Sequence, residues 1–134
     1  MLELTDSLRT GHPQIDAEHE KLFGCANMLI DAIGDSERFG EMAAKFFTMV
    51  EEHFVNEINI LKELGFPRVE QHARFHEEAV EEMAHLRRQL ETGSLLDMPE
   101  LIQERTVGLL VHDILQEDME FKSFLSELNE KPLA

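Results

Sequence analysis

Two pairs of chelating side chains, each pair spaced four residues apart, constrain this chain more than any other feature of its sequence. His53 and Glu57 form the first pair, and His72 and His76 form the second. On an α-helix, residues four apart differ in direction by about 40° and lie about one turn apart, so each pair shares a face. Between the pairs, Leu64-Gly-Phe-Pro67 is typical of one helix ending and another beginning. The spacing predicts two antiparallel helices that present imidazole and carboxylate groups to a common space.

A third helix adds His19, which shares a face with Leu22, Phe23 and Ala26. An isolated inward histidine is usually a hydrogen-bonded core residue. Several buried imidazoles without partners would be costly, however, and a metal ion would satisfy all of them. Imidazole and carboxylate donors together suit iron, zinc or manganese. We therefore interpret His19 as a further ligand of a metal site.

The apolar periodicity predicts an all-α protein, an up-down-up-down four-helix bundle with an extended N-terminal arm. The length of 134 residues fits a single domain. Pro13 suits the first turn of a helix, and Asp97-Met-Pro-Glu100 combines an N-cap residue with an early proline. The predicted segments are the arm, 1–14, and helices over about 15–33, 39–64, 67–90 and 97–128.

The last predicted helix offers two carboxylates. With Ile114 at the centre of its inward face, Asp118 lies about 40° from that centre and Asp113 about 100° to the other side. His112 lies about 160° away and is expected to face water if the helix is unbroken. A π-bulge would shift this phase by one residue and could bring His112 inward. The apolar stripe expected to face the core is Val107, Leu110, Val111, Ile114, Phe121, Leu125 and Leu128.

Composition excludes several classes of partner. A formal net charge of −16 opposes binding to nucleic acid or to an anionic membrane. No apolar run approaches the roughly 18 residues that cross a bilayer. The N-terminal residues lack a basic region followed by an apolar one, so no signal peptide is expected. A single cysteine, Cys25, rules out an internal disulfide, and we expect a cytoplasmic protein.

Four motifs follow one another between Gly11 and Leu125. They are Gly11-His-Pro-Gln-Ile-Asp16-Ala-Glu-His19, His53-Phe-x-x-Glu57, His72-x-x-x-His76 and Asp118-x-x-Phe121-x-x-Phe124-Leu125. In this order and at these separations they resemble the motifs of bacterial hemerythrins, four-helix bundles that bind dioxygen at a non-heme di-iron centre. Any one motif is weakly specific, and the set of four carries the resemblance.

The resemblance implies a particular centre. It would contain two non-heme iron ions joined by a bridging oxo or hydroxo group. The implied ligands are His19 and His53 for one iron, His72 and His76 for the other, and Glu57 and Asp118 as carboxylates that bridge the two.

One position departs from the family pattern. Asp113 stands where the family has a fifth histidine, and His112 is its neighbour. An ungapped alignment keeps Leu110 and Ile114 where the family has its oxygen-pocket residues, so we favour Asp113 over His112 as the ligand. A carboxylate there adds negative charge to the site and favours the ferric state.

Three functions follow as hypotheses. The first, which we favour, is a protein that binds dioxygen or a related small molecule for storage, delivery or sensing. The second is a di-iron ferroxidase or peroxidase on the same scaffold, which Asp113 would favour. The third is a structural or signalling bundle that holds another metal or none. The sequence leaves the protein partner, the oxygen affinity and the oligomeric state open.

Overall fold

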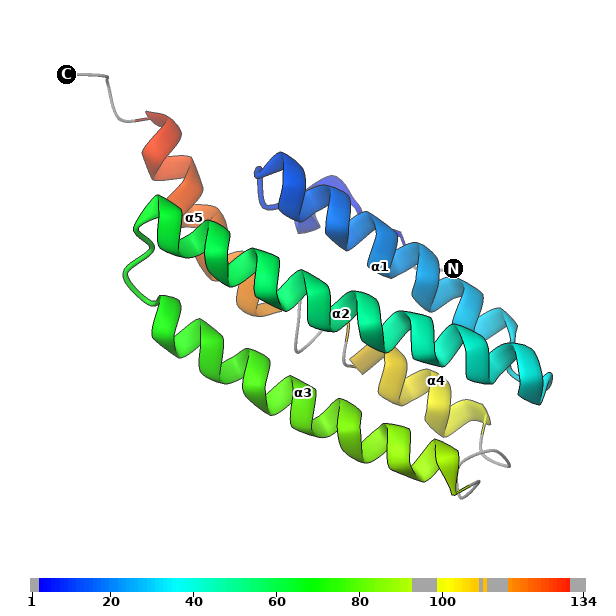
Figure 1. Cartoon of the computed structure of the whole chain (residues 1–134). Helices are drawn as coiled ribbons and strands as arrows, with labels where there is room; N and C mark the ends of the chain where they lie inside the picture. Colours follow the sequence, from blue (N-terminus) through cyan, green and yellow to red (C-terminus); the bar gives the residue numbers. More distant parts are fainter. Residues whose placement is uncertain (1–2, 93–98, 109, 111–115, 131–134) are drawn as a thin grey trace.

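The computed structural model describes residues 3–92, 99–108, 110 and 116–130. Within these ranges every regular element is helical and no strand occurs, which confirms the predicted all-α class. A short 3-10 turn, η1 (Asp6–Leu8), comes first (Figure 1). The α-helices are α1 (Pro13–Asp31), α2 (Ser36–Leu64), α3 (Val69–Glu91), α4 (Pro99–Gly108) and α5 (Gln116–Glu130).

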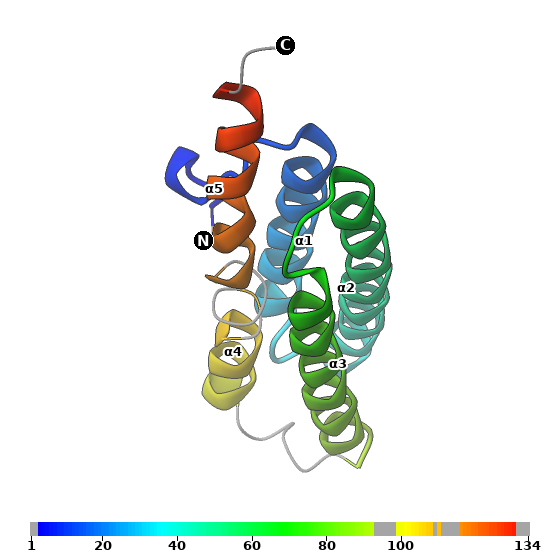
Figure 2. The ribbon, with the colours of Figure 1, turned by 90° about the vertical axis from the view of Figure 1, so that its left-hand side faces the viewer.

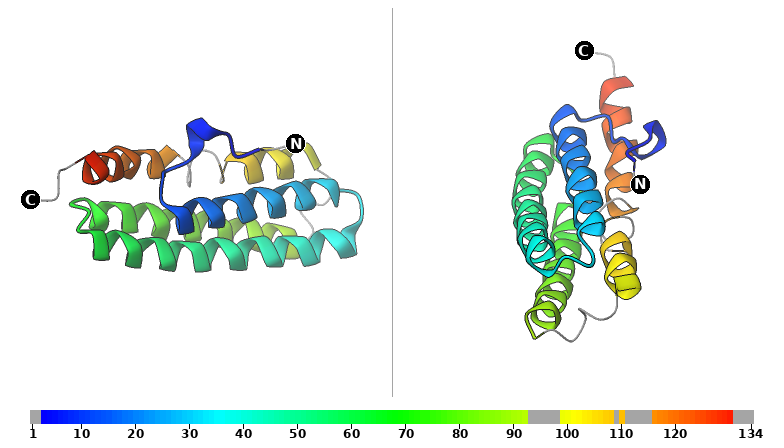
Figure 3. Two further views of the ribbon diagram at one scale, coloured as in Figure 1. Left: turned by 90° about the horizontal axis from the view of Figure 1, so that it is seen from above. Right: turned by 90° about the vertical axis from the view of Figure 1, so that its right-hand side faces the viewer.

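Three long helices form the body of the molecule. In Figure 1, α1, α2 and α3 run side by side, each in the direction opposite to the one before it. The shorter α4 and α5 lie end to end along the remaining side (Figures 2 and 3). An ion pair between Arg68 and Glu120 connects the start of α3 to α5. Among the described helices, none is both long and apolar enough to cross a membrane.

The helix α1 begins earlier than the apolar pattern predicted. Pro13 occupies its first turn, where the missing N–H costs nothing, and His12 caps it. The backbone N–H of Ile15 donates to His12 Nδ1 at 3.4 Å. The helix ends at Asp31, so it spans 13–31 rather than the predicted 15–33.

The N-terminal arm is fastened to α1 and is not wholly extended, because η1 interrupts it. The buried carboxylate of Asp16 accepts hydrogen bonds from Thr10 N at 2.7 Å, Thr10 Oγ1 at 2.8 Å and Gly11 N at 3.1 Å. Gly11 adopts a φ of 96°, which a residue without a Cβ tolerates. Asp16 therefore has a structural role in joining the arm to the helix.

The turn between α2 and α3 ends the first helix at Leu64, and the next helix begins at Val69. Gly65 takes a left-handed φ of 74°, and its N–H donates to Lys62 O, while Phe66 N–H donates to Leu61 O. The predicted start of the following helix at Pro67 is two residues early, since α3 begins at Val69.

The sequence prediction differs most from the structure at the fourth predicted helix, 97–128. Its described parts are α4 and α5, and Leu110 between them has a π-helical backbone. Leu125 is buried, but Leu128, expected to face the core, is 37% exposed. The last turns of α5 extend past the ends of the neighbouring helices (Figure 2), which agrees with the exposure of Leu128. The predicted cap at Asp97 lies outside the described residues.

Two apolar clusters lie along the helices, with a buried polar layer between them. On α1, for example, Ile15 belongs to one cluster, Leu22 belongs to the other, and His19 stands between them. The smaller cluster consists of Ile15, Leu61, Phe66 and Leu125, and the core of the larger one includes Leu22, Phe23, Phe46, Phe47, Val50, Phe54, Met83 and Leu110. The fold thus keeps the polar layer away from water.

Candidate metal centre

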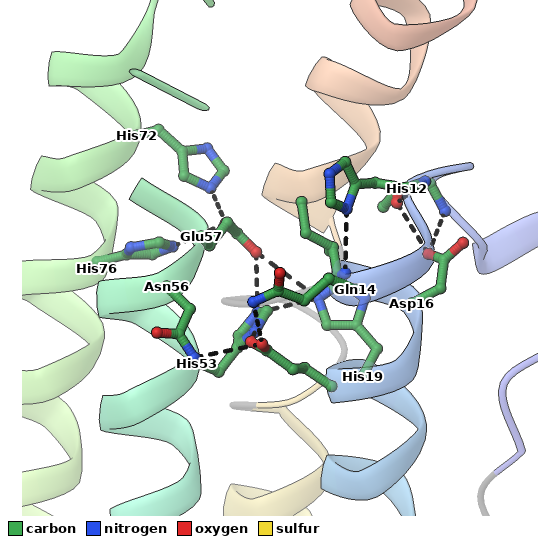
Figure 4. A network of polar contacts seen from close by, with 12 residues as sticks. His12, Gln14, Asp16, His19, His53, Asn56, Glu57, His72 and His76 are labelled. Atoms are coloured by element: carbon green, nitrogen blue, oxygen red, sulfur yellow. Dashed lines mark hydrogen bonds and ion pairs between the residues drawn. The ribbon is translucent and has the colours of Figure 1, made fainter. Parts of the chain in front are cut away.

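The centre of the polar layer is the carboxylate of Glu57, which has no solvent exposure. Its Oε2 lies 2.8 Å from His53 Nε2 and 3.8 Å from His19 Nε2. Its Oε1 lies 3.1 Å from His76 Nε2 and also contacts His72 Nε2. Figure 4 shows the imidazoles approaching this carboxylate from α1, α2 and α3. Each oxygen of one side chain therefore faces its own pair of imidazoles.

These residues form two overlapping groups, each able to hold a metal ion. His19, His53 and Glu57 make up one group, and Glu57, His72 and His76 make up the other. Within each group the ligand atoms lie within 4.8 Å of one another, and all of these residues are buried. Glu57 belongs to both groups, so the two candidate groups share its carboxylate.

The charge of Glu57 makes a cationic partner important. Burial raises the pKa of its carboxyl, but contacts with the four surrounding imidazoles outweigh burial and hold the pKa well below its usual range. The carboxylate is therefore ionised in the interior. A buried ionised group is tolerated only when paired or bound to a metal.

The imidazole nitrogens provide a test of whether a metal fits. His53 Nδ1 lies 2.7 Å from Glu18 Oε1, and a carboxylate in this position accepts a hydrogen bond from Nδ1–H. With its proton on Nδ1, a neutral His53 ring has a lone pair at Nε2, which a metal ion lying between Nε2 and the Glu57 carboxylate would accept. The same Nε2 lies 3.1 Å from His19 Nε2. Acceptor atoms that converge in this way fit a cation placed among them.

Apolar neighbours hold the imidazole rings in orientation. The ring of His76 stacks on Phe54, with centroids 3.9 Å apart and planes inclined by 10°. His72 meets the edge of Phe66 at a centroid separation of 6.5 Å, while His19 and His53 meet edge to face at 4.7 Å. These contacts limit ring rotation, so the ligand atoms keep their mutual positions.

The predicted site residues fall into two sets. His112 and Asp113 lie outside the described residues, and Asp118 lies in α5 with a side chain that is not described. The structure brings the other five together from three helices; they are His19, His53, Glu57, His72 and His76.

The sequence analysis predicted no role for Glu18, which it named only within the first motif. Besides the contact with His53, its Oε2 accepts hydrogen bonds from Gln14 Nε2 at 3.1 Å and Asn56 Nδ2 at 3.3 Å. Burial raises the pKa of Glu18, but hydrogen bonds from His53, Gln14 and Asn56 lower it overall. The available signal was the spacing of Gln14 and Glu18, four residues apart on one helix face.

A pocket of about 170 Å³ adjoins this part of the centre, between α1 and α2. Glu18 and His53 line it together with residues of both helices, so the Nδ1 side of His53 is close to solvent. The other lining residues are Lys21, Leu22, Met49, Glu52 and Asn56.

No protein-family model matches this chain, and no curated protein matches it significantly. What defines the class is therefore the molecule's own geometry: a helical protein with a buried histidine and glutamate centre that could hold a metal ion.

Proposed function

We propose that this chain is a hemerythrin-like protein that binds two iron ions and, through them, dioxygen. The observation that carries the proposal is the position of Glu57, whose two oxygens each face a separate pair of imidazoles. One bridging carboxylate between two histidine pairs is the arrangement that the four motifs imply for a di-iron centre. The geometry adds to the motif resemblance, since the spacing alone does not determine which oxygen each ring approaches.

The donor set supports iron. Nitrogen and carboxylate oxygen suit ferrous and ferric iron, whereas a structural zinc site commonly includes thiolate. Cys25 is packed in the larger apolar cluster and does not join the centre. Two ferrous ions held there would supply the two electrons that reduce dioxygen to the peroxide level. A free Cys25 also supports our proposal of a cytoplasmic location.

We propose further that α4 and α5 are two parts of one fourth helix, which completes a four-helix bundle. Asp113 and Asp118 are five residues apart. In an unbroken α-helix residues five apart point about 140° away from each other, but in a π turn they lie nearly over one another. The π-helical backbone at Leu110 precedes both residues, so it supports a local departure from the α-helical period and does not by itself change the angle between Asp113 and Asp118. A π-bulge could instead bring His112 inward, and we favour Asp113 because an ungapped alignment puts it where the family that the chain resembles has its fifth histidine.

Apolar side chains support the exclusion of water from the centre. Phe23, Phe54 and Leu110 are buried in one cluster, and Leu61 is fully buried in the other. Phe54 also touches the centre directly, through its stacking on His76. A dry surrounding strengthens electrostatic interactions and limits side reactions of a bound oxidant. Ile114, also expected in this wall, lies outside the described residues.

The alternative function is an enzyme on the same scaffold, a ferroxidase or peroxidase. The feature that favours it is Asp113 in place of the family's fifth histidine. Turnover separates the two functions, because an enzyme oxidises ferrous iron or consumes peroxide repeatedly. An oxygen-binding protein reacts once per centre.

The proposal is tested by adding ferrous iron to the metal-free protein under anaerobic conditions, removing the excess, and then admitting air. We expect two iron ions per chain and new charge-transfer bands in the visible spectrum after oxygen is added. Iron content near zero, or retention of zinc in protein purified without added metal, would contradict the proposal.

A further inference from the structure

The hydrogen bonding behind two of the imidazoles, those of His53 and His76, is unequal. Glu18 contacts His53 through Nδ1, on the side of the ring opposite to Glu57. No carboxylate among the described residues is recorded at the corresponding atom of His76, whose Nδ1 is buried without a hydrogen-bond partner there. A carboxylate behind a metal-binding histidine is known to fix its tautomer and to raise its basicity. In this chain that arrangement is present behind His53, on the α1 and α2 side.

We propose that Glu18 is a positioning residue that holds the proton of His53 on Nδ1 and thereby sets the metal affinity of the His19 and His53 half of the centre alone. The inference rests on the proposed function in that it takes a metal to bind there. It goes beyond that function because it says that Glu18 sets the metal affinity of only one of the two proposed metal positions.

The two carboxylate oxygens of Glu18 have different hydrogen-bond partners. Oε2 is anchored by the amides of Gln14 and Asn56, one on α1 and one on α2. Oε1 is thereby directed at His53 Nδ1, at 2.7 Å. A proton held at Nδ1 leaves Nε2 as an acceptor, which is the state that binds a metal. Glu18 thus acts through His53 and makes no contact with the metal position itself.

Glu52 offers a matched control. It is an exposed carboxylate on α2 that lines the same pocket, and no hydrogen bond joins it to any described imidazole. Glu52→Ala removes the same charge from nearly the same place without altering the partner of His53. An effect that both variants share would come from the loss of a negative charge near the pocket, and not from the loss of the His53 partner.

The experiment is a titration of the full metal-free chain with Co²⁺, followed by its visible d–d absorption. We compare the unaltered protein with Glu18→Ala, Glu18→Gln and Glu52→Ala, after checking helicity by circular dichroism. We expect two equivalents in the unaltered chain and in Glu52→Ala. In Glu18→Ala one equivalent should bind about 10–100-fold more weakly while the other is unchanged. Glu18→Gln should lose less, because its one amide oxygen can accept from Nδ1–H, although its amide nitrogen then faces the amides of Gln14 and Asn56.

A second measurement needs no metal. Long-range ¹H–¹⁵N NMR reports which ring nitrogens of His53 carry a proton. We expect a proton on Nδ1 in the unaltered chain, and its loss from Nδ1 in Glu18→Ala. Equal weakening of both Co²⁺ equivalents, no weakening of either, or an Nδ1 proton that persists in Glu18→Ala would overturn the inference.

The two proposals fail in distinguishable ways. If the unaltered chain binds two equivalents of Co²⁺ and Glu18→Ala binds them as tightly, the role of Glu18 is wrong and the proposed centre stands. If the unaltered chain binds none, the centre and the affinity claim both fall, whatever the NMR result for His53.

Discussion

His53 and Glu57 face each other one turn apart on α2, with 2.8 Å between His53 Nε2 and Glu57 Oε2, and neither side chain is more than 2% exposed. An ionised carboxylate and an imidazole therefore lie side by side in the interior of the protein. The same carboxylate meets the imidazoles of α3 through its other oxygen. One residue therefore links both halves of the centre, and the predictions below depend on that link.

The substitution Glu57→Gln keeps the volume of the side chain and removes its charge. We expect the variant to lose both metal ions, because the shared ligand serves both positions. The measurement is iron content per chain after anaerobic reconstitution and removal of excess metal. Glu63→Gln, an exposed position on the same helix, is the matched control and should retain two. Two tightly held iron ions in Glu57→Gln would show that this carboxylate is not the bridge.

The substitution His76→Ala should remove one metal ion and leave the other. It also deletes the ring that stacks on Phe54 and that lies 3.1 Å from Glu57 Oε1. We therefore expect the metal-free variant to lose about 1–3 kcal/mol of unfolding free energy, as when a buried polar group loses a partner. Metal analysis and urea denaturation measure the two effects. His85→Ala, at an exposed position of α3, should change neither.

The identity of the ligand before Asp118 is tested by a pair of neighbouring substitutions. We expect Asp113→Ala to weaken iron binding and alter the visible spectrum, because the motif resemblance puts Asp113 at the position of a fifth histidine ligand. His112→Ala should leave the spectrum intact. The opposite result, loss of iron in His112→Ala alone, would place the histidine at the centre.

The buried thiol of Cys25 gives a prediction with a definite pH dependence. Burial raises the pKa of Cys25, while the charge of Lys45 lowers it to a smaller extent. The folded chain therefore keeps this proton after the unfolded chain has lost it, and stability should fall as pH rises above the unfolded pKa, near 8.5. Urea denaturation between pH 7 and pH 10 measures this, with Cys25→Ala as the control. A pH slope unchanged in that variant would exclude Cys25 as its source.

The histidine and glutamate pairs were predictable because helical spacing alone fixes which residues share a face. His53 with Glu57, and His72 with His76, needed only the four-residue offset and the turn between them. His19 needed the added argument that isolated buried imidazoles are costly. All five residues do meet in the structure.

Other features depend on contacts that periodicity does not encode. Glu18 acquires its role from Asn56 on the neighbouring helix, and that meeting depends on how α1 and α2 pack. Leu128 fits the apolar stripe of its helix but is 37% exposed, and the last turns of that helix extend past the ends of its neighbours (Figure 2). The π-helical backbone at Leu110 breaks the period on which a face prediction depends.

The most direct measurement of the central claim is anomalous X-ray diffraction at the iron edge from crystals of the reconstituted protein. The account predicts two iron peaks, one between Glu57 Oε2 and the imidazoles of His19 and His53, and one between Glu57 Oε1 and those of His72 and His76. A single peak, or none within bonding distance of Glu57, would contradict it.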